Sequence, residues 1–67
     1  MKNKIHLILE KITKILHVIP KGPLITKFVG SYGGHIFSVT VDNGIVRRVR
    51  CNSKTYNKKL YALVSKA

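Results

Sequence analysis

The residues with the clearest potential for chemistry are a histidine and the two glycines before it. His35 directly follows Gly33 and Gly34. An imidazole exchanges protons near neutral pH, so His35 could take the proton of a ribose 2′-hydroxyl and start RNA cleavage without a metal. The glycines would let a phosphate approach the backbone closely. The alternative is that His35 is an ordinary residue at the start of a strand, and both interpretations stay open.

Cations that follow His35 in the chain form a second candidate site. Three arginines occur close together, and lysines follow them at the start of the last segment. Guanidinium and ammonium groups clustered beside a helix N-terminus bind anions such as phosphate, because the donors and the helix dipole act together. The sequence therefore predicts a nucleic-acid-binding surface made of Arg47, Arg48, Arg50, Lys54, Lys58 and Lys59.

Charge is the strongest property of the chain as a whole. Its 67 residues include 13 Lys and Arg but only two acidic side chains, which gives a net charge of +11. Such a surface attracts polyanions, and the candidates are nucleic acid, an acidic protein and an anionic membrane. The length suits one small domain that covers residues 1–67, and an apolar content of 45% is typical of a folded chain.

No metal or cofactor site is expected. Cys51 is the only cysteine, which excludes an internal disulfide and a zinc site of paired cysteines. A carboxylate that could orient His35 is not evident, because Asp42 belongs to a turn too distant along the strand and Glu10 cannot be placed. No stretch is apolar for the roughly 20 residues that a membrane span needs. We therefore expect a cytoplasmic protein without a membrane partner, either a monomer or a homodimer paired along an open sheet edge.

Apolar residues with helical spacing mark both ends of the chain. Residues 2–18 carry isoleucine and leucine at intervals of three and four, which predicts an amphipathic helix ended by Pro20. The last segment, 53–67, shows similar spacing from Tyr56 onward, and Ser53 or Thr55 can cap it. Each helix has one apolar stripe, which must be buried against another element.

Three strands are expected between the helices. The first covers residues 24–29, and two more form a hairpin on either side of Asp42-Asn43-Gly44. The resulting order is helix, strand, strand, strand, helix. Both helices can bury their stripes on one face of a three-stranded antiparallel sheet. The predicted fold class is therefore α+β, with the other sheet face open.

The register of the hairpin decides where the arginines lie. A three-residue loop puts Phe37 and Val39 on one face, with Arg48 and Arg50 on the other. A two-residue turn would put all four on one face, and burying guanidinium groups is costly. We therefore predict the three-residue loop. This choice leaves Arg47 on the apolar face, where it either extends to the sheet edge or contacts a ligand.

Two stretches resemble double-stranded-RNA-binding domains, which have this order of elements. GGHIFSVTV, residues 33–41, is similar to the glycine-then-histidine entry into the middle strands of that family. Ser53 to Ala67 resembles its final helix, and the resemblance implies that Lys58 and Lys59 grip RNA phosphates. The HicA-type mRNA interferase toxins share the fold and often have Gly-Gly-His at this point, which implies a catalytic role for His35.

Three functions are consistent with these features. The first is a small basic nucleic-acid-binding protein that contacts phosphates, with RNA favoured over DNA and with little sequence readout. The second is a HicA-like, metal-independent ribonuclease toxin that uses His35 as its base. The third is a viral or host-directed module that binds an acidic protein partner.

Overall fold

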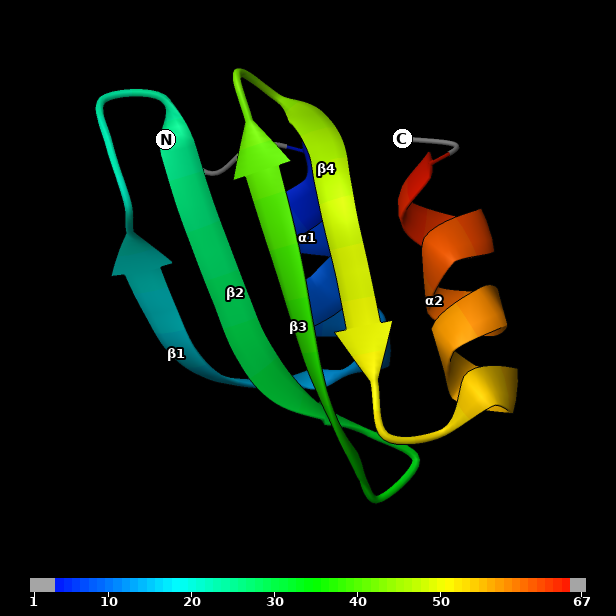
Figure 1. The fold of residues 1–67 in the computed structure, drawn as a ribbon. Helices are drawn as coiled ribbons and strands as arrows, with labels where there is room; N and C mark the ends of the chain where they lie inside the picture. Colours follow the sequence, from blue (N-terminus) through cyan, green and yellow to red (C-terminus); the bar gives the residue numbers. More distant parts are fainter. Residues whose placement is uncertain (1–3, 66–67) are drawn as a thin grey trace.

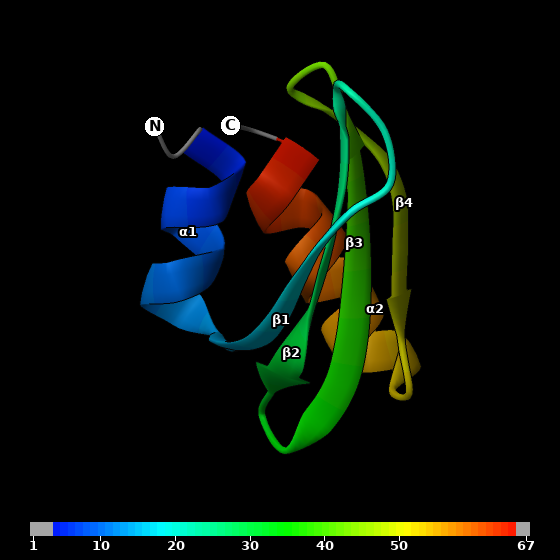
Figure 2. The ribbon, with the colours of Figure 1, turned by 90° about the vertical axis from the view of Figure 1, so that its left-hand side faces the viewer.

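The computed structural model describes residues 4–65 and contains two helices and four strands (Figure 1). In chain order the elements are α1 (Lys4–Ile12), β1 (Lys14–Pro20), β2 (Ile25–Tyr32), β3 (His35–Asp42), β4 (Ile45–Cys51) and α2 (Lys54–Ser65). The strands form one antiparallel sheet in the order β1-β2-β3-β4, and both helices lie on the same side of it (Figure 2). The predicted α+β class is confirmed, but the sheet has four strands where three are predicted.

The additional strand, β1, occupies the second half of the segment 2–18, for which the spacing predicts a helix. α1 ends at Ile12, and the backbone N–H and side-chain hydroxyl of Thr13 both donate to the carbonyl of Leu9. The residues that follow are rich in β-branched side chains, which favour strands. The prediction of a helix as far as residue 18 is therefore wrong. Apolar spacing alone did not separate a helix from a strand that contains a bulge, and β1 has such a bulge at Leu16.

The other predicted elements agree with the structure to within a few residues. β2 covers Ile25–Tyr32, where a strand over 24–29 is predicted. α2 begins after Ser53, whose Oγ accepts a hydrogen bond of 3.4 Å from the backbone N–H of Tyr56, so Ser53 is the cap. Residues 2–3 and 66–67 of the two predicted helices lie outside the described residues. Neither helix within 4–65 has the length and apolar character that crossing a bilayer requires.

The core lies between the two helices and the sheet face that they cover. Side chains alternate along β3, so Phe37, Val39 and Val41 point toward the helices while Ile36, Ser38 and Thr40 point away. We call the face that points away from the helices the open face. The buried side chains are Ile5, Leu9, Phe28, Phe37, Val39, Val41, Leu60 and Val64.

The β3–β4 hairpin keeps its arginines out of this core by a route that differs from the prediction. Its turn is the two-residue Asn43-Gly44, with φ values of 52° and 77°, as a type I′ turn requires. Arg47 has no partner in β3 and forms a β-bulge. The three-residue loop is therefore wrong. The predicted faces of Arg48 and Arg50 are nevertheless right, because the bulge shifts the register by one residue.

At Gly30, β2 leaves no room for a side chain beside β1. This glycine is buried and pairs with Ile15, beside the bulge at Leu16. A Cβ at Gly30 would collide with the backbone carbonyl oxygen of Lys14, which cannot move without displacing the strand. The fourth strand therefore depends on the absence of a side chain at this position.

We expect Gly30→Ala to destabilise the protein by about 1–3 kcal/mol, because the added methyl group forces β1 away from β2. Chemical unfolding measures the change, and hydrogen exchange should show the largest loss of protection in β1. Gly22→Ala is the control, since a Cβ there makes its nearest contact with Ile25 at an ordinary 3.8 Å. That change should alter the stability by less than about 0.5 kcal/mol. Equal effects of the two substitutions would contradict the proposed close contact.

Candidate nucleic-acid interface

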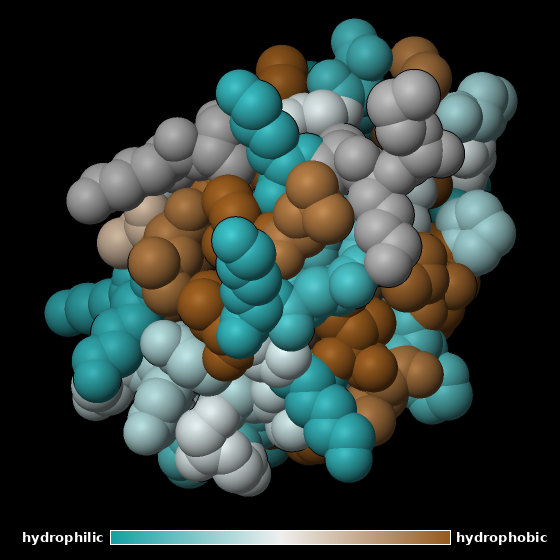
Figure 3. Space-filling model, turned by 180° about the vertical axis from the view of Figure 1, so that it is seen from behind, coloured by the Kyte–Doolittle hydropathy of each residue, from teal (hydrophilic) through white to brown (hydrophobic). Residues whose placement is uncertain are grey.

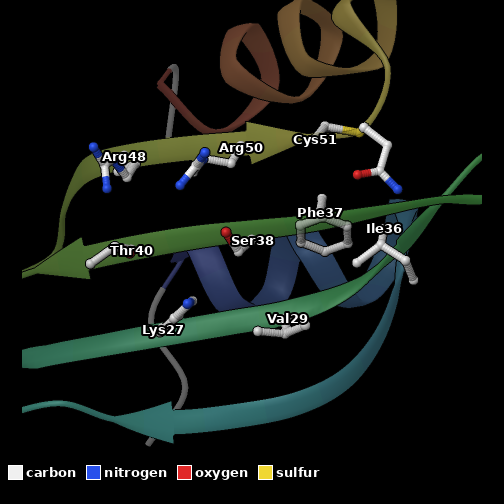
Figure 4. A pocket seen from close by; sticks show the side chains of 10 residues that line it. Lys27, Val29, Ile36, Phe37, Ser38, Thr40, Arg48, Arg50 and Cys51 are labelled. Atoms are coloured by element: carbon white, nitrogen blue, oxygen red, sulfur yellow. The ribbon is translucent and has the colours of Figure 1, made fainter.

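The open face carries side chains in two rows that run across the strands (Figure 4). In the first row Lys27 of β2 faces Thr40 of β3, which in turn faces Arg48 of β4. The second row is formed in the same way by Val29, Ser38 and Arg50. Residues two apart on a strand share a face, so the rows are about 7 Å apart. Each of these two polar rows therefore has an arginine on β4 with a hydroxyl beside it on β3.

The two polar rows line a hollow of ≈ 420 Å³ on the open face. Its wall continues toward the end of β4 through Ile36, Cys51 and Asn52. The lining includes three cationic side chains and no acidic one, and both arginines are exposed. An anion that enters the hollow would therefore meet positive charge from β2 on one side and from β4 on the other (Figure 4).

Neither acidic side chain lines this hollow, although Asp42 lies on the open face, two residues beyond Thr40 on β3. Asp42 lies 3.6 Å from Nε of Arg47, in a pair that is exposed to solvent. Glu10 lies 3.1 Å from Nε2 of His6, within α1 on the covered side of the sheet. Among the described residues, no carboxylate is therefore paired with Arg48 or Arg50. The charge of the two polar rows remains available for a ligand.

None of the predicted lysines of α2 lines the hollow with Arg48 and Arg50. Lys54 and Lys58 are four residues apart on the side of α2 opposite the buried Leu60, and both are exposed. Lys59 lies with its Nζ 5.3 Å from the ring centre of Tyr56. Five of the six predicted residues therefore divide into three groups: Arg48 and Arg50 on the open face, Lys54 and Lys58 on the outer side of α2, and Lys59 over a tyrosine. Arg47, paired with Asp42, lies apart from all three.

His35 lies on the opposite face of the sheet from the arginines. It shares the covered face of β3 with Phe37 and Val39, and its ring centre is 5.0 Å from that of Tyr56 on α2. Tyr56 also meets Tyr32 edge-on at 5.0 Å. The imidazole is therefore half-buried in an aromatic cluster and does not face the two polar rows.

The glycines before His35 have a structural role that explains this cluster. Gly33 and Gly34 form a two-residue turn between β2 and β3, and both have positive φ (59° and 83°). A Cβ on Gly33 would collide with the ring of Tyr56, whereas one on Gly34 would meet nothing. Gly33 therefore lets α2 close over the end of the hairpin. The two glycines, which could also let a phosphate approach, are accounted for by the turn and by the packing of Tyr56.

One functional candidate was missed by the sequence analysis. Lys27 completes the first polar row, although it belongs to β2 and is distant in the chain from the arginines. A signal was present, because Lys27 precedes the apolar Phe28 and strand alternation places neighbours on opposite faces. Assigning Lys27 to the same hollow required the pairing of β2 with β3, which no local pattern supplied.

Comparisons with protein families, with curated proteins and with solved structures find no match to this chain. Within residues 4–65, no three His, Cys, Asp or Glu side chains gather as they would around a metal ion. The functional argument therefore depends on the geometry of the open face.

We expect His35→Phe to keep the RNA affinity within about twofold of that of the unchanged chain. The ring contact with Tyr56 is kept, and the two polar rows lie on the other face. His35→Ala should lower the unfolding free energy by about 1–2 kcal/mol through loss of that contact, again without changing RNA binding. Filter binding and thermal unfolding measure these effects. Cleavage of an end-labelled RNA, or growth arrest on expression, that disappears with either substitution would instead support the toxin hypothesis.

Proposed function

We propose that this chain binds nucleic acid through the phosphates of its backbone, on the open face of the sheet. The observation that carries the proposal is the pair of polar rows, in which an arginine stands beside a hydroxyl twice at a spacing of about 7 Å. Guanidinium and hydroxyl groups both donate hydrogen bonds to phosphate oxygens. A repeated pair of donors suits a repeated anion, which favours a polymer over a single small ion.

Contact with bases would be secondary. All five Phe and Tyr side chains belong to the described residues, and none of them lies on the open face. Phe28 and Phe37 are buried in the core, while Tyr32 and Tyr56 form the cluster with His35. Stacking on aromatic rings is the usual way to hold unstacked bases. Its absence here supports recognition of the charged backbone with little sequence readout.

Long-range attraction supports the same function. A net charge of +11 raises the local concentration of any polyanion near the surface and accelerates its association. The preference for RNA comes from the resemblance of the C-terminal half to RNA-binding domains. The donors of the two polar rows suit the phosphates of either nucleic acid, so RNA and DNA of matched length are both tested.

Charge reversal distinguishes this site from a general effect of net charge. We expect Arg48→Glu/Arg50→Glu to lower the affinity for a short RNA by well over tenfold, because two phosphate contacts become repulsive. Lys54→Glu/Lys58→Glu changes the net charge by the same amount on the outer side of α2, and it should lower the affinity by less than threefold. Fluorescence anisotropy at fixed salt measures both, and circular dichroism verifies folding. Equal losses of affinity in the two variants would show that net charge alone accounts for RNA binding. An unchanged affinity in the arginine variant would contradict the proposed site.

The dependence of nucleic-acid affinity on salt concentration reports the number of phosphate contacts. Three cations in the hollow predict a log–log slope of affinity against salt of about −2 to −3, at roughly −0.7 per phosphate on single strands and −0.9 on duplexes. Lys27→Gln should make the slope shallower by about 0.7–0.9, because one phosphate contact is lost. Lys21→Gln, which removes a charge outside the hollow, should leave the slope unchanged. A slope that Lys27→Gln does not alter would exclude this lysine from the interface.

A further inference from the structure

The two edges of the sheet differ in how well they are protected. β4 has a bulge at Arg47 and carries three arginines, and Asn57 of α2 donates from Nδ2 to the carbonyl of Val49 at 3.5 Å. Bulges, charged side chains and a covering helix are the usual means of preventing an edge strand from pairing with another chain. This edge is therefore closed to a further strand.

β1 forms the opposite edge. It has two protective features of its own, a bulge at Leu16 and a proline at its end, Pro20, and both lie outside residues 17–19. Within the described residues its only strand partner is β2. Leu16, Val18 and Ile19 are 47%, 46% and 38% exposed, and no charged residue lies between Lys14 and Lys21. Figure 3 shows the molecule from behind. Hydrophobic side chains reach the surface on its right, which is the side on which β1 lies. The outward backbone groups of β1 are thus accompanied by apolar contacts for an incoming chain.

We propose that β1 binds an extended, acidic segment of another protein, which adds to the sheet as a fifth strand. An open edge supplies backbone donors and acceptors for such a segment, and the exposed side chains select its apolar residues. After the bulge at Leu16, β1 pairs regularly from His17 to Pro20, which gives the segment a straight ladder to continue. Pro20 has no N–H and ends the available ladder.

Charge decides the chemistry of the partner. Lys14 begins β1 and Lys21 follows its last residue, so the two cations flank the strand, roughly 20 Å apart when one residue is in a bulge. Lys27 adds positive charge beside the strand, as the residue opposite Ile19. A segment with an apolar centre and acidic residues at both ends matches this arrangement.

A second copy of the chain fits the same edge poorly. Two β1 strands in antiparallel pairing would set the Lys14 end of one copy against the Lys21 end of the other. Like charges opposite one another destabilise strand pairing, and each copy brings a net charge of +11. The edge is therefore assigned to an acidic chain and not to self-association.

The test uses a nine-residue peptide of alternating valine and threonine with two glutamates at each end. Nuclear magnetic resonance titration should show the largest amide shifts in residues 14–20, with slower hydrogen exchange there. The same peptide with lysines in place of the glutamates should bind at least tenfold more weakly. A version with N-methyl groups on alternate amides should also bind at least tenfold more weakly, because it cannot complete the ladder.

Variants of the chain complete the design. Lys14→Gln/Lys21→Gln should lower the affinity for the glutamate peptide at least fivefold. Lys54→Gln/Lys58→Gln, which removes the same charge from α2, should keep that affinity within twofold of the unchanged chain. Equal binding of the lysine or N-methyl peptide, shifts centred on another element, or sedimentation showing a dimer formed through β1 would overturn the proposal. Arg48→Glu/Arg50→Glu changes the nucleic-acid site without changing this edge, because the two arginines lie on β4, at the opposite end of the sheet from β1.

Discussion

Guanidinium groups are costly to bury without a carboxylate partner, and the β3–β4 hairpin is organised around that constraint. The chain has only two acidic side chains, so the arginines of β4 must reach water, although Val49 and Cys51 of the same strand pack against the core. The bulge at Arg47 satisfies both demands. It allows the tight Asn43-Gly44 turn and still directs the following arginines away from the core. The apolar core and the cationic open face both depend on this one additional residue.

The division of the sheet into two faces separates stability from the candidate function. The covered face holds the core and the aromatic cluster around Tyr56, which joins α2 to the turn at Gly33. The open face holds Lys27, Arg48 and Arg50, while Asp42 on the same face is paired with Arg47 and Glu10 lies on the covered side. His35 lies on the covered face against Tyr56, away from the two polar rows. The two edges add a second asymmetry, because charge and α2 protect β4 while β1 remains accessible.

The sequence predicted most of what depends on neighbouring residues. The alternation of β3 gave the correct inner and outer faces, as did that of β4 after its bulge, and Ser53 was one of the two caps considered for α2. The fourth strand was missed because the spacing of isoleucines after Thr13 suits a helix and a bulged strand alike. The choice between them depended on pairing with β2, which requires Gly30 to lack a side chain. That contact joins segments far apart in the chain.

By itself the sequence determined the charge of the molecule, the α+β class and the separation of arginines from the core, since each follows from composition or from short-range periodicity. Only the tertiary structure decided which cations line the same hollow. Strand pairing brought Lys27 into one row with Arg48, on either side of Thr40. The lysines of α2 do not line that hollow, and a helix that buries Leu60 turns Lys58 outward. The residues that become neighbours across a sheet depend on the strand register and on the side on which a helix packs. Both depend on the free energy of the whole fold, so no single segment encodes them.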